Sequence, residues 1–162
     1  MKTLVVYYSR TGHVRELAKK VAAALGADTD EIIDRDDRNR RGGYLRSVYQ
    51  RIRGRSANIE PALKSPGGYD FVVVGTPVWV GSMSTPVRAY LDAHARELSK
   101  VAFFCTLGGS GAATTFRKME KLSGKTPVAT LAIVERKLGD ASTQAEITAF
   151  TARISSPALE PA

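Results

Sequence analysis

Apolar residues in this chain form short runs separated by turn residues, which indicates a protein with several buried strands. Continuous apolar runs without polar alternation are typical of parallel strands that are buried on both faces. The clearest such run lies at residues 71–74, and the run at residues 31–33 is weaker. The predicted strands cover residues 4–8, 31–33, 71–74, 101–105 and 128–134.

Between these runs, apolar residues recur three and four positions apart, which is the spacing of an amphipathic helix. Pro86 stands at a favoured first-turn position, while Gly26 and Gly124 end two of the segments. Residues 54–69 show no period and are rich in proline and glycine, so we predict an extended linker there. The predicted helices cover residues 14–25, 43–53, 86–98 and 112–122, and a last helix includes residues 146–154.

Five strands that alternate with five helices predict an α/β fold: a doubly wound parallel sheet with helices on both faces and right-handed crossovers. We assign residues 1–154 to one domain and predict that the proline-containing tail, residues 155–162, is disordered. In such a fold, ligands bind outside the carboxyl ends of the strands, where the strand order reverses. The loops after the first, third and fourth strands are therefore the candidate site.

The composition favours a globular chain without a membrane span. Its 162 residues are 43% hydrophobic, enough to bury a core in one domain. No apolar stretch approaches the roughly 18 residues that cross a bilayer, and the first residues show no cleavage-site pattern, so we expect a cytoplasmic protein. Cys105 is the one cysteine, and no Cys or His cluster has metal-ligand spacing, so we expect neither an internal disulfide nor a metal site.

The net charge of +8 is concentrated in one stretch of the sequence. The segment Arg35–Arg55 holds eight arginines against Asp36 and Asp37, a net charge of +6. Such a segment favours an acidic partner, which could be a protein surface, a nucleic acid or a phosphorylated ligand. A solvated helix face is the alternative interpretation.

The first candidate loop turns directly from a strand into a helix. Backbone N–H groups at a helix start attract anions, and two hydroxyl groups and a glycine accompany them here. This arrangement suits a terminal phosphate, although an ordinary Ser/Thr-capped helix would share the pattern. The candidate ligand residues are Ser9, Arg10, Thr11, Gly12, His13 and Val14.

The second and third candidate loops suit a flat ligand. The second, after the third strand, is apolar and holds the only tryptophan, Trp79, which either covers a planar ring or folds back into the core. The third loop, after the fourth strand, is rich in glycine. Without side chains in the way, the edge of a ligand could approach the backbone amides of this loop. Candidate contacts are Pro77, Val78, Trp79, Val80 and Gly81 in the second loop, and Thr106, Leu107, Gly108 and Gly109 in the third.

Three other nucleotide or phosphate folds are disfavoured. The Walker pattern of phosphate-binding loops is absent. Residues 109–114 resemble half of a dinucleotide fingerprint but follow the fourth strand, and Ala129 stands where an acid is required. A phosphorylated receiver domain needs a carboxylate at the end of its third strand, where this chain has Gly75 and Thr76.

The three loops together resemble those of the flavodoxin family, especially its short members. The matching motifs are Tyr-Ser-x-Thr-Gly at residues 8–12, Thr-Pro-Val-Trp-x-Gly at 76–81 and Cys-Thr-x-Gly-Gly-Ser-Gly at 105–111. The resemblance implies a five-stranded sheet of order 2-1-3-4-5 and flavin mononucleotide (FMN) as the cofactor. It places the FMN phosphate in the first loop, the isoalloxazine ring against the second and its pyrimidine edge at the third. His13 and Val14 replace the Asn and Thr usual in this family, and a protonated His13 could compensate for the lost hydroxyl or point to solvent.

The resemblance implies electron transfer, and no acid, base or nucleophile constellation appears in the loops. We therefore predict no catalytic residue and an FMN-binding protein that carries electrons between redox partners. Whether the chain is an enzyme stays open, with small FMN-dependent quinone reductases and protoporphyrinogen oxidases as alternatives. Carrier flavodoxins are typically acidic, so a +8 chain departs from that pattern and suggests a partner with an acidic surface. The remaining alternative is a non-redox module that binds nucleic acid through the Arg35–Arg55 face.

Overall fold

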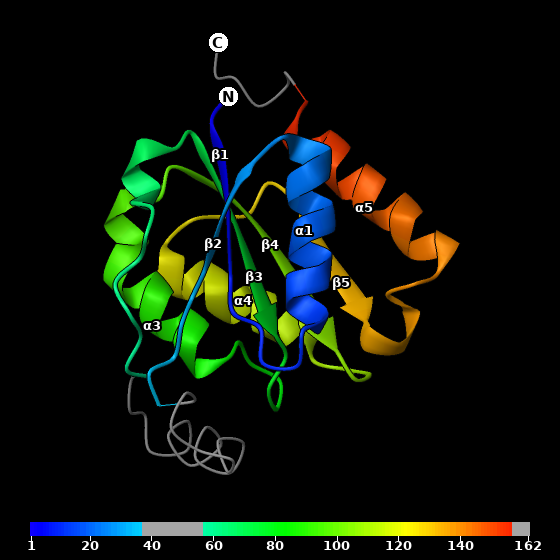
Figure 1. The fold of residues 1–162 in the computed structure, drawn as a ribbon, viewed down its shortest axis with the longest axis horizontal. Helices are drawn as coiled ribbons and strands as arrows, with labels where there is room; N and C mark the ends of the chain where they lie inside the picture. Colours follow the sequence, from blue (N-terminus) through cyan, green and yellow to red (C-terminus); the bar gives the residue numbers. More distant parts are fainter. Residues whose placement is uncertain (37–56, 157–162) are drawn as a thin grey trace.

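A computed structural model describes residues 1–36 and 57–156, which form one parallel sheet with helices on both faces (Figure 1). The strand order is β2-β1-β3-β4-β5, and each neighbouring pair is parallel. This confirms the predicted fold class and strand order. The strands are β1 (Thr3–Tyr7), β2 (Asp28–Glu31), β3 (Phe71–Pro77), β4 (Lys100–Leu107) and β5 (Thr130–Val134).

The helices pack in two layers that enclose the sheet (Figure 1). One core cluster joins α1 and α5 to one face, and a second joins α3 and α4 to the other. The central strands β1 and β3 are buried at every position, as expected of strands covered on both sides. The helices described are α1 (His13–Leu25), α3 (Thr85–His94), α4 (Ala112–Ser123) and α5 (Ala141–Ile154), with short 3₁₀ turns η2 (Pro66–Gly68), η3 (Ala95–Glu97) and η4 (Glu135–Lys137).

The second strand was predicted three residues too late. The structure places β2 at Asp28–Glu31, and the apolar Ile32 and Ile33 follow it. Since β2 lies at the edge of the described sheet, next to β1, its sequence does not need a continuous apolar run. Ile32 is nevertheless buried, and its N–H donates to the carbonyl of Tyr7 at 2.7 Å.

Part of the predicted extended linker forms local structure. Ile59 makes an isolated antiparallel bridge with Asp34, and residues 66–68 form the turn η2. The predicted second helix at residues 43–53 lies outside the described residues, as do nearly all of the Arg35–Arg55 segment and residues 157–162 of the predicted tail. In residues 1–36 and 57–156, no helix has the length and apolar character needed to cross a membrane.

Candidate functional site

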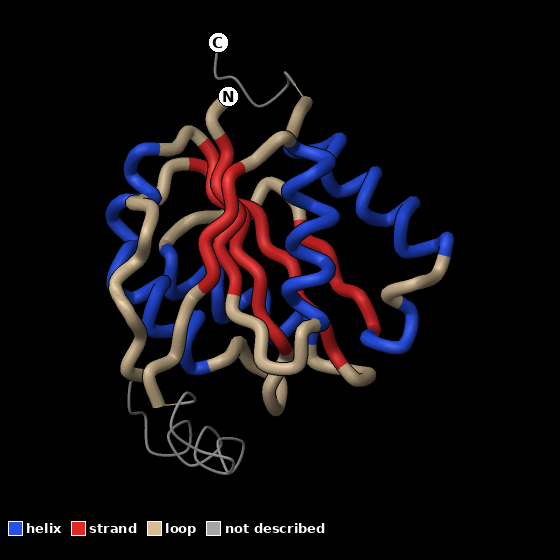
Figure 2. Tube along the Cα trace, in the orientation of Figure 1, coloured by secondary structure: helices blue, strands red, loops and turns tan. Residues whose placement is uncertain are grey.

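The carboxyl ends of the five strands meet at one edge of the sheet, opposite the start of β1 and the end of α5 (Figure 1). Figure 2 shows the loops after β1, β3 and β4 side by side at this edge. Strand order reverses between β1 and β3, because β2 and β3 flank β1 on opposite sides. The three loops singled out in the sequence therefore lie where doubly wound folds bind their ligands.

The first loop ends in a helix start that has no side-chain cap. Gly12 takes the N-cap position of α1 with φ 99°, a left-handed conformation that favours glycine. The hydroxyl oxygen of Ser9 accepts the N–H of Gly12 at 3.1 Å, which leaves its own proton free to donate. Because no side chain in residues 1–36 and 57–156 caps α1, its first-turn N–H groups are available to an anion.

The side chains of the first loop divide into buried and accessible groups. Ser9 is only 8% exposed, and Val14 points into the core, so Val14 could contact a ligand only through its backbone. Arg10 and Thr11 are exposed. Phosphate contacts from this loop are therefore limited to hydroxyl groups, backbone amides, the Arg10 guanidinium and the His13 ring.

An ion pair between α1 and β2 supports this loop, and sequence patterns did not reveal it. The guanidinium of Arg15 donates to both carboxylate oxygens of Glu31, at 3.0 and 2.6 Å. The hydroxyl of Tyr7 also donates to Glu31, at 3.3 Å. Burial and the Glu31 carboxylate raise the pKa of the Tyr7 phenol, so the phenol keeps its proton. These three residues join the ends of β1 and β2 to the first turn of α1.

The second loop begins with a buried hydrogen-bond network. The hydroxyl of Thr76 accepts the N–H of Ser84 at 2.9 Å and lies 2.9 Å from the carbonyl of Pro77, to which it donates. The hydroxyl of Ser84 caps α3 by accepting the N–H of Val87 at 3.5 Å. The network fixes both ends of the loop between β3 and α3.

The tip of the second loop is a tight turn with an unusual residue. Trp79 and Ser82 exchange two backbone hydrogen bonds, and the central residues Val80 and Gly81 have φ of 49° and 65°. Two positive φ values are those of a type I′ turn, which favours Asn and Gly. Val80 is branched at Cβ and still occupies the first of these positions, with its side chain 68% exposed.

Replacing Val80 by asparagine is expected to stabilise the protein. A residue with a branched side chain in the left-handed region costs about 1 to 2 kcal/mol, while Asn adopts it readily. We expect V80N to raise the free energy of unfolding by about 1 kcal/mol in chemical denaturation of the ligand-free protein. A lower unfolding free energy would show that the Val80 side chain makes contacts that outweigh the strain.

Trp79 lies between the core and the solvent. Its side chain is half-buried and packs against the core cluster that includes α3. Its ring stands perpendicular to that of Tyr8, with centroids 5.7 Å apart. Tyr8 follows β1, and its N–H donates to the carbonyl of Gly75 at 3.3 Å. This aromatic pair brings the first and second loops together.

The third loop packs directly against the second. The N–H of Val78 donates to the carbonyl of Thr106 at 2.9 Å. A Cβ on Gly111 would lie 3.0 Å from Cα of Gly81, and Gly111 has φ 102°. The loop therefore needs glycine here for both space and conformation. Lys118 of α4 adds a hydrogen bond of 3.2 Å to the carbonyl of Gly81.

The remaining glycines of the third loop leave open space. A Cβ on Gly108 or Gly109 would meet nothing within 4 Å, and both residues are exposed. Thr106 is fully buried, and its hydroxyl has no hydrogen-bond partner among the described residues. An unpartnered buried hydroxyl is costly, so a polar ligand atom nearby would be favourable. Pro77 and Leu107 have buried side chains, so only their backbones could meet a ligand.

Cys105 takes no part in this chemistry. Its side chain is fully buried in β4, and burial raises the pKa of the thiol to about 12. A thiol of that kind is protonated and unreactive at neutral pH.

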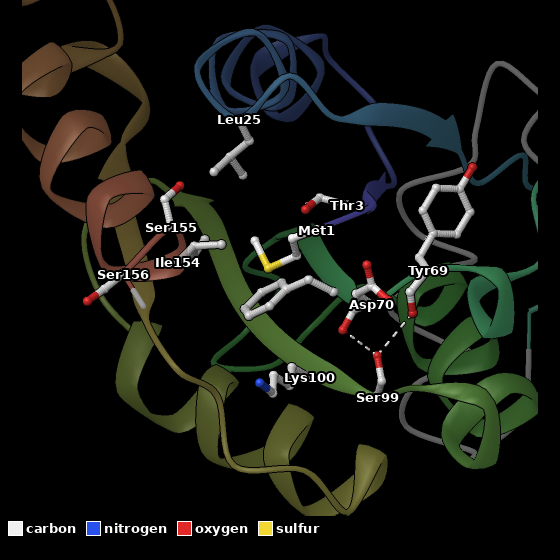
Figure 3. A pocket seen from close by; sticks show the side chains of 11 residues that line it. Met1, Thr3, Leu25, Tyr69, Asp70, Ser99, Lys100, Ile154, Ser155 and Ser156 are labelled. Carbon is white, nitrogen blue, oxygen red and sulfur yellow. Dashed lines mark hydrogen bonds between the residues drawn. The ribbon is translucent and has the colours of Figure 1, made fainter. Parts of the chain in front are cut away.

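A cavity in the described part of the chain lies elsewhere. It has a volume of about 840 Å³ and opens at the amino end of the sheet, opposite the three loops. Figure 3 shows Ser155 and Ser156 on one side of it, and Tyr69 and Asp70 on the other. The Ser99 hydroxyl there is already bonded to the Tyr69 and Asp70 carbonyls. The cavity presents no cluster of reactive groups, so we assign it no chemistry.

The residues at the carboxyl edge fit a planar ring with a phosphorylated tail. An uncapped helix start, two hydroxyl groups and an imidazole suit the phosphate. An accessible tryptophan and open glycine backbone lie next to them, together with an unpartnered threonine hydroxyl. Near these groups, Glu135 of η4 lies 3.4 Å from Nδ1 of His13. Like Arg15 and Glu31, it could not be found from sequence patterns, because the contact joins distant segments.

Comparisons with known proteins place the chain in a family. A family model described as flavodoxin matches residues 2–154. NAD(P)H dehydrogenase (quinone) 3 of Rhizobium meliloti (strain 1021) is 34% identical over 92 residues, which is 56% of this chain and only 42% of that protein. Less than half of that relative is therefore represented in the match.

Many solved structures share the fold, and two of them are informative. The flavoprotein from Lactobacillus acidophilus NCFM in complex with FMN is 21% identical and has a TM-score of 0.69, covering 87% of this chain and 98% of that one. Two-electron reduced Megasphaera elsdenii flavodoxin is 16% identical and has a TM-score of 0.60, covering 94% of this chain and 99% of that one. Together with the match over residues 2–154, the sheet order shows that this chain belongs to the flavodoxin family.

Proposed function

We propose that this chain binds one FMN across the three loops and transfers electrons between redox partners. FMN as the cofactor agrees with the family and with the FMN complex of the related fold from Lactobacillus acidophilus. The observation that carries the assignment to these loops is the uncapped start of α1, next to open glycine backbone and an accessible tryptophan on one edge of the sheet. When bound, FMN supplies the electron-transfer chemistry, and the protein holds and shields it.

Each loop has a separate task in this proposal. Ser9, Thr11 and the first-turn amides of α1 hold the phosphate, with Arg10 and His13 as charged neighbours. Residues 77–81 lie along the ring, and Trp79 covers one of its faces. Backbone amides of the third loop and the hydroxyl of Thr106 meet the polar edge of the ring. Because the second and third loops pack together through Gly81 and Gly111, the ring side of the site is held as one unit.

Replacing Thr11 by alanine tests the phosphate assignment. Its hydroxyl is exposed and lies 3.1 Å from Nδ1 of His13, so its loss should leave the core unchanged. We expect FMN binding to weaken by about 2 kcal/mol, the usual effect of removing a hydrogen bond to a charged group. Riboflavin, which lacks the phosphate, serves as the control ligand and should bind T11A as it binds the original protein. Equal losses for both ligands would assign Thr11 to loop structure.

The visible absorption spectrum of protein purified without added cofactor tests the proposal directly. We expect flavin absorption bands that remain with the protein through gel filtration, and FMN as the released compound after denaturation. A colourless protein that takes up no FMN on incubation would contradict the proposal.

We also propose that the redox partner presents an acidic surface and that the protein acts in the cytoplasm. Lys118 of α4 is exposed and bonds the second loop at Gly81, and Arg10 is exposed in the first loop. These exposed basic side chains place positive charge beside the three loops, which favours acidic partners. Nucleic-acid binding through Arg35–Arg55 stays a prediction, because nearly all of that segment lies outside the described residues.

A second candidate is reduction of quinones with NAD(P)H, and the match to the Rhizobium meliloti enzyme favours it. Because that match covers only 42% of the relative, we offer its quinone reductase activity as a proposal for this chain. FMN-loaded protein should then oxidise NADH or NADPH when a small benzoquinone is added. A carrier alone would show no turnover with these two reagents and would instead accept electrons from a separate reductase.

A further inference from the structure

His13 lies between two groups that both approach the same ring nitrogen. Its Nδ1 is 3.1 Å from the hydroxyl oxygen of Thr11 and 3.4 Å from a carboxylate oxygen of Glu135. Glu135 belongs to η4, which follows β5, so it comes from a segment far from the first loop in the sequence. The side chains of His13 and Glu135 are 42% and 37% exposed, so protons can exchange with water.

We propose that His13 is a proton-dependent contact for the FMN phosphate, and that Glu135 orients its ring. FMN binding then takes up a proton on His13, and the affinity for FMN depends on pH in a way that riboflavin affinity does not. This inference rests on the proposed function, because it deepens the phosphate site assigned above.

The position of Glu135 favours one arrangement of protons on the ring nitrogens. A carboxylate beside Nδ1 favours the tautomer with a proton on Nδ1, because a bare nitrogen there would face the negative oxygen. The second proton of the imidazolium then resides on Nε2, the nitrogen that neither Thr11 nor Glu135 approaches. Thr11 can accept from Nδ1 and still donate its own proton, so both residues can serve the phosphate together.

The other charged groups near His13 come from three segments. On α1, Arg15 is paired with Glu31 and Glu16 is paired with Lys20 at 3.1 Å, so each has a partner other than His13. On η4, the basic residues next to Glu135 are exposed, as is Arg10 in the first loop. The basic residues of η4 are Arg136 and Lys137. Glu135 is thus the carboxylate that the structure pairs with the His13 ring.

The direction of the pH effect follows from linkage. A phosphate dianion beside His13 favours the imidazolium, so His13 titrates at higher pH in the complex than in the free protein. The added affinity is fully present below the titration of the free protein and is lost as the pH rises through the titration in the complex. Ionisation of the phosphate near about pH 6 has the opposite effect, because the dianion binds more strongly. The two effects must therefore be separated with a variant.

Measuring the FMN dissociation constant between about pH 5 and about pH 8 separates them. The variants are H13N, which keeps a hydrogen-bonding side chain without a titrating charge, and E135Q, which removes only the carboxylate charge. We expect the original protein to bind FMN about tenfold or more tightly than H13N at the acidic end, and this ratio to shrink towards neutral and higher pH. E135Q should bind FMN more weakly than the original protein at the acidic end, because the His13 ring loses the carboxylate that orients it. Riboflavin affinity should be the same in all three.

NMR of the histidine rings gives a readout that does not depend on affinity. The chain has two histidines, and His94, paired with Glu97 at 2.8 Å, serves as an internal reference. We expect the His13 signal to titrate at higher pH with FMN than with riboflavin, and the His94 signal to titrate at the same pH with both. The same pH profile of FMN affinity in the original protein and in H13N would overturn the inference, as would an unmoved His13 titration. Absence of FMN binding at every pH would instead contradict the proposed function itself.

Discussion

Replacing Gly75 by alanine is expected to destabilise the protein by about 3 kcal/mol, the upper part of the usual range for overpacking a core. Gly75 lies near the end of β3, paired with Tyr7 of β1 and Phe104 of β4. A Cβ at this position would lie 2.0 Å from Cζ of Phe104, whose ring is fully buried. Because the ring has no free space, either the ring or the strand must move. Chemical denaturation of the ligand-free protein measures the change.

Two further variants make the Gly75 prediction specific. Gly139 has open space where a Cβ would be added and has no left-handed φ, so G139A should change the unfolding free energy by less than about 0.5 kcal/mol. Combining G75A with F104L should recover part of the loss, because the shorter side chain removes the contact. If G75A has the same effect with and without F104L, the Phe104 ring is not the cause.

FMN is expected to quench most of the indole emission of the ligand-free protein. Trp79 is the only tryptophan, so the emission reports on one position. Its half-buried ring lies at the carboxyl edge of the sheet beside Tyr8, at the place assigned to the ring of the cofactor. Fluorescence lifetimes measured during an FMN titration avoid the absorption of light by the flavin itself.

Riboflavin and inorganic phosphate serve as controls for the quenching. Riboflavin carries the same ring and should shorten the lifetime as strongly as FMN once it is bound, whereas phosphate should leave it unchanged. If the lifetime at FMN saturation equals that of the ligand-free protein, Trp79 is a core residue and another side chain covers the ring.

The fold could be predicted from the sequence because burial on both faces leaves a clear signal. The strands β3 and β4 were found from unbroken apolar runs, and β1 was found within one residue of its bounds. The edge strand β2 has the polar sequence Asp-Thr-Asp-Glu, so its pattern carried no such signal. The strand was instead predicted at the apolar residues Ile32 and Ile33, which follow the end of β2.

The candidate site was only partly predictable. Its three loops stand out because they combine hydroxyl groups, a lone tryptophan and glycines directly after strands. The pairs Arg15 with Glu31 and His13 with Glu135 join segments that no periodic pattern connects, so they required the structure. The need for glycine at position 75 also comes from a neighbouring strand, through the ring of Phe104.

Equilibrium titration of the ligand-free protein with FMN and with riboflavin tests the central claim most directly. The proposed site predicts one FMN per chain and an affinity for FMN at least about tenfold higher than for riboflavin, because several hydrogen bonds of the first loop are made only to the phosphate. Saturable FMN binding with this preference would support the assignment of the three loops. Absence of saturable FMN binding, or equal affinity for the two ligands, would contradict it.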